Sequence, residues 1–130
     1  MMNKAKLLIV DDEPDIRKVL KKRLETAGFE CFTAADATEA IRLAKHKQPS
    51  LIILDLVLPG RDGVQIYQEL KSSEDTNHIP IIVYTAQNPD IVVKKGLQAL
   101  SIVDFVLKPF DSQALISLIN LSLEEKKPKS

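Results

Sequence analysis

Short, uninterrupted apolar segments that end at a carboxylate are the feature that most restricts the fold of this chain. Residues 7–10 and 51–54 read Leu-Leu-Ile-Val and Leu-Ile-Ile-Leu, and each run stops at an aspartate, Asp11 or Asp55. A strand without polar alternation is buried on both faces, which is typical of parallel sheets covered by helices on both sides. Parallel neighbours also need long crossover connections, usually helices. The sequence therefore predicts an α/β fold with a doubly wound parallel sheet.

The rest of the chain alternates between strand and helix patterns. Five strands are predicted, at residues 7–10, 29–34, 51–54, 79–84 and 102–107. Apolar residues at helical spacing predict five helices, at residues 14–28, 36–49, 64–70, 91–100 and 111–123. Pro14 suits the first turn of a helix and Gly28 suits a helix end, while Asp36 precedes Glu39 at the spacing of a capping box. A loop is expected through residues 59–63, which include Pro59, Gly60 and Gly63.

Length and charge restrict the class of protein. At 130 residues and 14.5 kDa the chain fits one domain. We expect that domain to span residues 1–123, with residues 124–130 as a charged tail or the start of a linker. Eighteen basic residues balance eighteen acidic ones. The positive field that non-specific nucleic-acid binding needs is therefore missing, and we expect no direct nucleic-acid partner.

The cysteine count and the apolar runs indicate a cytoplasmic location. Cys31 is the only cysteine, so no disulfide can form within the chain. No apolar run approaches the roughly 20 residues that span a bilayer, and no membrane partner is expected. We interpret Cys31 as a core residue rather than a reactive thiol, and His46 and His78 as surface residues.

Reactive side chains follow the predicted strands where each one ends. Asp11 and Asp12 follow the first strand, Asp55 the third, Thr85 the fourth and Lys108 the fifth. Ligands in open α/β sheets bind outside the carboxyl ends of the strands, so these five side chains are expected to converge on one edge. Closely spaced carboxylates repel one another unless a cation intervenes, and an all-oxygen group suits magnesium. The sequence predicts a site for Mg²⁺ as cofactor.

Asp55 is the best candidate for a nucleophile in this group. It ends the most strongly apolar strand, whereas Asp11 and Asp12 form a pair that suits metal binding. With Mg²⁺ and Lys108 neutralising the oxygens of an incoming phosphoryl group, a carboxylate can attack phosphorus, as in aspartyl-phosphate chemistry. Thr85 is expected to donate a hydrogen bond to a phosphoryl oxygen.

Four motifs, in order along the chain, resemble the receiver domain of bacterial response regulators. They are Val10-Asp11-Asp12-Glu13-Pro14, Leu54-Asp55-Leu56-Val57-Leu58-Pro59-Gly60 with Asp62-Gly63, Tyr84-Thr85-Ala86, and Asp104-Phe105 leading into Lys108-Pro109-Phe110. The resemblance covers about residues 6–123. It implies a flavodoxin-like fold of five βα units, similar to chemotaxis regulators, with the strands ordered 2-1-3-4-5. It also implies a phosphoprotein in two-component signal transduction.

The resemblance implies how the site works. Asp12, Asp55 and the backbone carbonyl of Val57 would bind Mg²⁺ directly, and Asp11 would act largely through a bound water. Asp55 would accept a phosphoryl group from the phosphohistidine of a sensor histidine kinase or a phosphotransfer protein. The side chains that end the fourth and fifth strands would contact the phosphoryl oxygens.

The resemblance also implies how occupancy of the site is transmitted. The Lys108-Pro109 bond would be cis, an uncommon but accessible state before proline. Thr85 would couple to Phe105, a switch aromatic that remodels the face formed by the fourth helix, the fifth strand and the fifth helix. A downstream protein or a second copy would bind that face. The chain would then be no conventional enzyme but a signalling switch that catalyses its own phosphorylation and dephosphorylation.

The last predicted helix carries more apolar residues than one core-facing stripe requires. They are Leu115, Ile116, Leu118, Ile119, Leu121 and Leu123. Some apolar surface is expected to remain after this helix packs on the sheet, as a surface for a partner or a homodimer.

Other functions stay open. One is a degenerate receiver that serves only as a docking module. Another is a phosphatase with an aspartate nucleophile, although such enzymes place a second aspartate where this chain has Val57. The sequence also leaves open the cognate kinase, and whether the chain acts alone or comes from a multidomain protein.

Overall fold

A computed structural model describes residues 4–55, 57–58, 61–85, 104–107 and 112–125 of the chain. The helix predicted over residues 91–100 lies outside these ranges, and so do Lys108, Pro109 and Asp111. What was predicted for these residues therefore stays a prediction.

Within the described residues, five parallel strands form the central sheet. They are β1 (Lys6–Val10), β2 (Glu30–Ala34), β3 (Leu51–Asp55), β6 (Ile81–Thr85) and β7 (Asp104–Leu107). Their spatial order is β2-β1-β3-β6-β7, and every neighbouring pair is parallel. Counted along the chain, these five strands are ordered 2-1-3-4-5. The predicted doubly wound sheet and its strand order are confirmed.

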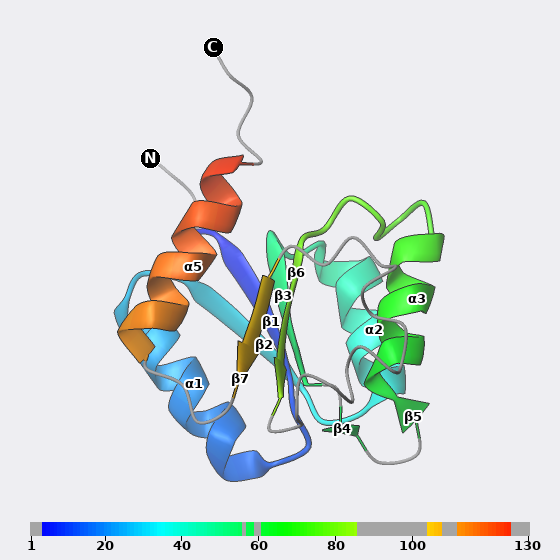
Figure 1. Ribbon diagram of the computed structural model, residues 1–130, viewed down its shortest axis with the longest axis horizontal. Coiled ribbons are helices and arrows are strands. Elements are labelled where there is room, and N and C mark those ends of the chain that lie inside the picture. The colour runs from blue at the N-terminus through cyan, green and yellow to red at the C-terminus, as the bar shows by residue number, and fades with distance from the viewer. Residues whose placement is uncertain (1–3, 56, 59–60, 86–103, 108–111, 126–130) are drawn as a thin grey trace.

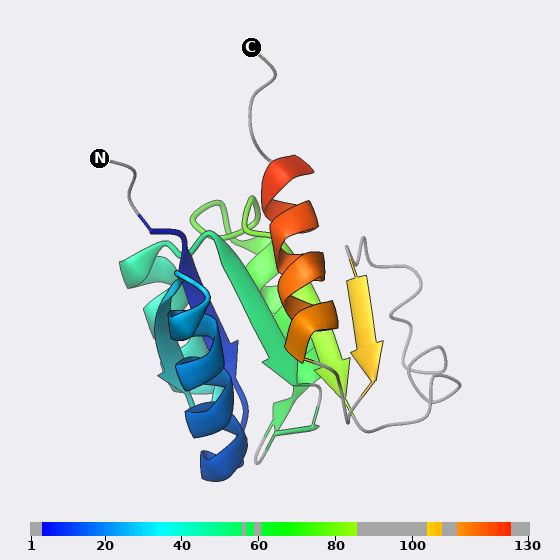
Figure 2. The same ribbon diagram turned by 90° about the vertical axis from the view of Figure 1, so that its left-hand side faces the viewer.

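Helices cover both faces of this sheet. Figures 1 and 2 show α1 (Pro14–Thr26) and α5 (Ser112–Glu125) on one face, with α2 (Ala37–Lys47) and α3 (Gly63–Ser72) on the other. Successive residues of a strand point to opposite faces. Leu8 and Val10 of β1 accordingly belong to the core under α2 and α3, and Leu7 and Ile9 belong to the core under α1 and α5. Burial on both sides explains why these strands are uninterrupted apolar runs.

The helix ends follow the local signals in the sequence. Pro14 begins α1, and Gly28 follows its end with a φ of 104°, which favours glycine. The Asp36 side chain accepts a hydrogen bond from the Glu39 backbone N–H at 2.9 Å, so Asp36 is the N-cap of α2. Helices α1 and α2 both pack against β1 and β2.

Two details of the predicted elements were wrong. The loop after β3 contains a short antiparallel hairpin of β4 (Val57–Leu58) and β5 (Arg61–Asp62), and Gly63 begins α3 instead of lying in the loop. Each strand of this hairpin has only two residues, which is too short for an alternation of apolar and polar residues to appear in the sequence. The fourth strand was predicted to begin at Ile79, but β6 begins at Ile81. Pro80 lies before this start, because proline has no N–H to donate to a neighbouring strand.

Helix α5 leaves apolar surface exposed, as predicted. Leu115 and Ile119 are buried in the core under α1 and α5, whereas Leu121 is 56% exposed. The other large apolar residues of this helix are half-buried, namely Ile116, Leu118 and Leu123. One side of α5 therefore packs on the sheet, and Leu121 lies on a side that the described residues do not cover.

The residues interpreted as structural occupy the expected places. Cys31 is buried on β2, and burial, aided by the charge of Glu25, raises the pKa of its thiol to about 11. It is a core residue. His46 and His78 are exposed, as predicted. Within the described ranges, no helix is long and apolar enough to cross a lipid bilayer.

Candidate functional site

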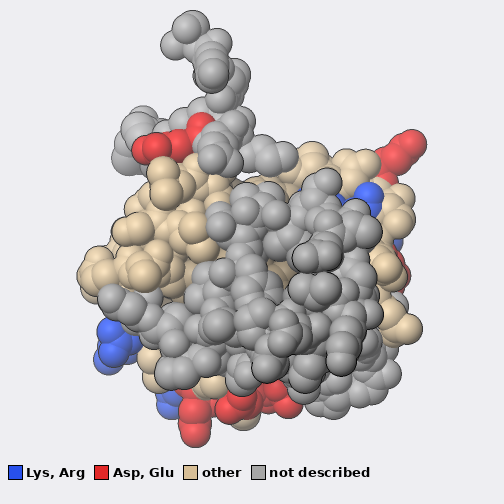
Figure 3. Space-filling model, viewed as in Figure 1, with Lys and Arg blue, Asp and Glu red and all other residues tan. Residues whose placement is uncertain are grey.

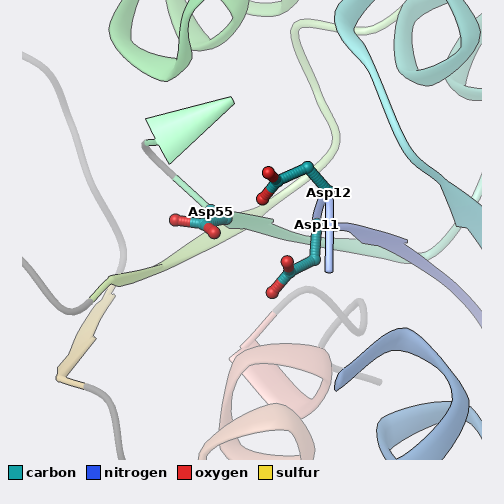
Figure 4. A group of neighbouring side chains, drawn as sticks. All are labelled: Asp11, Asp12 and Asp55. Carbon is teal, nitrogen blue, oxygen red and sulfur yellow. The ribbon is translucent and has the colours of Figure 1, made fainter. Parts of the chain in front are cut away.

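Neighbouring strands bring three aspartates to one point at the carboxyl edge of the sheet. β1 and β3 are paired in a parallel register that sets Val10 opposite Leu54. The next residues are Asp11 on one strand and Asp55 on the other, and Asp12 follows directly. Figure 4 shows the three side chains gathered where β1 and β3 end. Acidic groups also lie along the lower edge of the molecule in Figure 3, where Figure 1 shows the strand ends.

The three carboxylates are close together, and two of them are buried. One oxygen from each lies within 4.8 Å of the others. Asp11 is 0% exposed and Asp55 is 3% exposed, whereas Asp12 is open to solvent. Two unit charges at this separation repel by about 3 kcal/mol at an effective dielectric constant of about 20. The fold therefore concentrates negative charge that a cation would neutralise.

Hydrogen bonds fix the turn that carries Asp11 and Asp12. The Asp11 N–H donates to the Ala34 carbonyl on β2 at 3.1 Å, and Asp11 Oδ1 accepts from the Glu13 N–H at 2.8 Å. Arg17 of α1 donates from Nη1 to the Asp11 carbonyl at 2.6 Å. Arg17 was not predicted as a site residue. No signal in the sequence indicated this contact, because Arg17 stands among other basic residues on a helix with an exposed polar side.

Register places a further predicted residue at the same edge. Thr85 is the last residue of β6, and the preceding residue, Tyr84, pairs with Asp55 across the β3–β6 ladder. Phe105 lies in β7, where it pairs with Val83 of β6. The backbone of Thr85 therefore lies at the carboxyl edge of the sheet, and the roles predicted for the Thr85 and Phe105 side chains stay predictions.

The donor set at this edge fits one Mg²⁺ ion. Mg²⁺ takes oxygen ligands in octahedral geometry and keeps several waters, so it needs only one or two carboxylates from the protein. Three carboxylates are present, and the exposure of Asp12 leaves one of them accessible to water. Val57, the predicted carbonyl ligand, begins β4 two residues after Asp55. Lys108, the predicted cation at this site, lies outside the described residues.

Comparison with known proteins identifies the family. The family model of the response regulator receiver domain matches residues 7–120. The chain belongs to the response regulator receiver family. Among curated relatives of this receiver, the phosphate regulon transcriptional regulatory protein of Pseudomonas aeruginosa is 36% identical over 122 residues, which cover 94% of this chain and 53% of that protein. The receiver spans about half the length of the curated relatives that it matches.

Solved structures confirm the receiver fold. The chemotaxis response regulator of Vibrio cholerae is 28% identical, with a TM-score of 0.83 over 92% of this chain and 99% of that chain. The receiver domain of a sensor histidine kinase from Pseudomonas aeruginosa is 27% identical, with a TM-score of 0.86 over 94% and 99% of the two chains. That second structure has a magnesium ion coordinated in its active-site cleft.

Proposed function

We propose that this receiver is a phosphoacceptor switch in which Asp55 takes a phosphoryl group from the phosphohistidine of a sensor histidine kinase or a phosphotransfer protein. The position of Asp55 carries the proposal. Its carboxylate is 3% exposed at the end of the central strand β3, with two other carboxylates within 4.8 Å. Burial of like charges lowers stability. A cluster of this kind is therefore better explained by cation and phosphoryl chemistry than by a structural role.

The surroundings of the three aspartates favour Asp55 as the nucleophile. Asp12 is exposed to solvent, whereas Asp55 is only 3% exposed. β3 lies between β1 and β6 in the sheet, so Asp55 has the other two aspartates on one side and the strand that ends at Thr85 on the other. A phosphoryl group on Asp55 would lie between metal ligands and a hydroxyl donor.

The proposed transfer replaces one bond to phosphorus by another. A carboxylate oxygen of Asp55 attacks phosphorus, and a P–O bond forms while the P–N bond to the donor imidazole breaks. The electron pair of the broken bond goes to the ring nitrogen, so a ring that carries a proton on its other nitrogen leaves as neutral imidazole. Hydrolysis resets the switch, because attack of water on phosphorus releases inorganic phosphate and returns the Asp55 carboxylate.

Each remaining residue of the site has a proposed task. Mg²⁺, when bound, would neutralise charge on the carboxylates and the phosphoryl oxygens. Asp12, Asp55 and the Val57 carbonyl would hold it directly, and Asp11 would hold it through water. The Thr85 hydroxyl and the ammonium group at position 108 would contact phosphoryl oxygens. The receiver would thereby catalyse only the gain and loss of its own phosphoryl group.

The output surface would include β7 and α5. Thr85 pairs with Leu107 of β7, the strand that also carries Phe105, so the strand end beside Asp55 adjoins the proposed switch aromatic. Leu121 of α5, 56% exposed, offers an apolar anchor for a downstream protein or a second copy. Balanced charge supports a switch that acts through protein contacts rather than direct contact with nucleic acid or membrane. The single cysteine of the chain supports a location in the reducing cytoplasm.

Labelling with acetyl phosphate in the presence of Mg²⁺ tests the proposal against its alternatives. We expect one phosphoryl group on the wild-type chain, none on Asp55→Asn, and one on Asp75→Asn, a control at an exposed aspartate. A docking module without phosphoacceptor activity would take no label. A phosphatase would hydrolyse external phosphate esters with many turnovers. Either outcome would reject the phosphoacceptor switch.

A further inference from the structure

Arg17 connects α1 to the acidic edge through two hydrogen bonds. Its backbone N–H donates to the Glu13 carbonyl at 3.1 Å, and its Nη1 donates to the Asp11 carbonyl at 2.6 Å. The guanidinium bond is short and partly buried. Hydrogen bonds from a charged donor are roughly twice as strong as neutral ones. The Arg17 side chain therefore has a defined position beside the turn between β1 and α1.

The carbonyl that accepts from Arg17 belongs to the peptide that joins Asp11 to Asp12. Rotation of this peptide changes ψ of Asp11 and φ of Asp12, and so redirects the Asp12 side chain. Asp11 is also held at its N–H by Ala34 and at its carboxylate by Glu13. Arg17 adds the contact on the carbonyl side, which is the side that leads to the exposed Asp12.

We propose that Arg17 is a positioning residue for the carboxylate cluster. By holding the peptide between Asp11 and Asp12, it keeps both carboxylates directed at the cation that the cluster takes, without touching that cation or the phosphoryl group. The proposal rests on the proposed function only in assigning Mg²⁺ to the cluster. Removal of a group that orients metal ligands typically lowers metal affinity about 10- to 100-fold.

A positioning role and a purely electrostatic role predict opposite effects of a neutral side chain at position 17 on Mg²⁺ affinity. The positive charge of Arg17 repels Mg²⁺, so if charge alone acted, a neutral side chain would strengthen Mg²⁺ binding. If the hydrogen bond to the Asp11 carbonyl acts, a neutral side chain that loses this bond weakens Mg²⁺ binding. Lysine keeps the charge but lacks the planar, forked donor group, so Arg17→Lys separates the two effects.

Calorimetric titration of the full chain with Mg²⁺ tests the proposal. We expect the dissociation constant to rise about 10- to 100-fold in Arg17→Gln, and by a smaller factor in Arg17→Lys. Lys18→Gln removes the same charge from the exposed neighbour of Arg17, and should change the constant by less than about twofold. Hydrogen exchange gives a readout without metal. The Glu13 amide, which donates to Asp11, should exchange faster in Arg17→Gln than in the wild type.

Several outcomes would overturn the positioning role. They are unchanged or tighter Mg²⁺ binding in Arg17→Gln, an equal loss in Lys18→Gln, and a wild-type chain that binds no Mg²⁺. If circular dichroism shows that Arg17→Gln does not fold, the Mg²⁺ affinity of Arg17→Lys tests the proposal instead. An Arg17→Lys variant with the Mg²⁺ affinity of the wild type would reject the proposal. The proposed function can be rejected independently of the positioning role. A wild type that takes no phosphoryl group, with Mg²⁺ affinity still lost in Arg17→Gln, would reject the phosphoacceptor and retain the positioning residue.

Discussion

Removal of the Asp55 charge is expected to stabilise the metal-free protein. Asp55 and Asp11 are 3% and 0% exposed, with carboxylate oxygens within 4.8 Å of one another. Their repulsion is about 3 kcal/mol at an effective dielectric constant of about 20. Asparagine keeps the shape of the side chain and removes the repulsion, but it weakens hydrogen bonds that a carboxylate accepts. The expected net gain is about 1 to 3 kcal/mol, or a rise in Tm of about 3 to 12 °C for a domain of this size.

Thermal unfolding in EDTA and in Mg²⁺ measures this effect. The wild type should gain stability when Mg²⁺ is added, because the cation binds the folded cluster and not the unfolded chain. Asp55→Asn should begin at a higher Tm in EDTA and gain less from Mg²⁺. The surface control Asp75→Asn should match the wild type in both conditions. A Tm of Asp55→Asn in EDTA equal to or below that of the wild type would refute the electrostatic reasoning.

Three further predictions concern residues outside the cluster. The unfolded chain ionises its thiol near the ordinary pKa of 9.0, whereas the folded chain holds Cys31 protonated to about 11. Between about pH 9 and about pH 11, the free energy of unfolding should therefore fall more steeply in the wild type than in Cys31→Ala. Urea titration measures this, and parallel curves of unfolding free energy against pH would contradict it. Ser122→Ala should raise the free energy of unfolding by about 1 kcal/mol, because Ser122 Oγ is buried with no hydrogen-bond partner among the described residues. A urea midpoint below that of the wild type would contradict this prediction. Leu121→Gln should weaken self-association through α5 in sedimentation velocity with beryllofluoride, without reducing phosphorylation of Asp55. A wild-type chain that stays monomeric with beryllofluoride would reject the homodimer and leave a separate downstream protein as the partner.

The sheet and its acidic edge could be predicted because strands that are buried on both faces can be arranged in few ways. The runs at residues 7–10 and 51–54 are apolar at every position, and the structure buries both faces of each strand. Strands of that kind are parallel and central, so their carboxyl ends lie at one edge. Asp11 and Asp55 follow those ends, and their proximity is a consequence of parallel pairing.

Features that depend on how the elements pack were not predictable in the same way. Arg17 lies on a helix with other basic residues, and its sequence context is that of a solvated surface arginine. Its bond to the Asp11 carbonyl depends on the path of the chain from β1 into α1. Gln48 is a similar case, because its side chain donates to the Asp75 carbonyl at 2.9 Å, 27 residues away in the chain. Apolar periodicity carries no information about such polar contacts.

The identity of the phosphorylated residue tests the central claim most directly. Borohydride reduces an aspartyl phosphate to homoserine, so peptide mapping by mass spectrometry after treatment with acetyl phosphate, Mg²⁺ and borohydride locates the acceptor. We expect homoserine at position 55 and unmodified aspartate at positions 11 and 12. Homoserine at position 11 or 12, or none in the wild-type chain, would contradict the assignment of Asp55 as the phosphoacceptor.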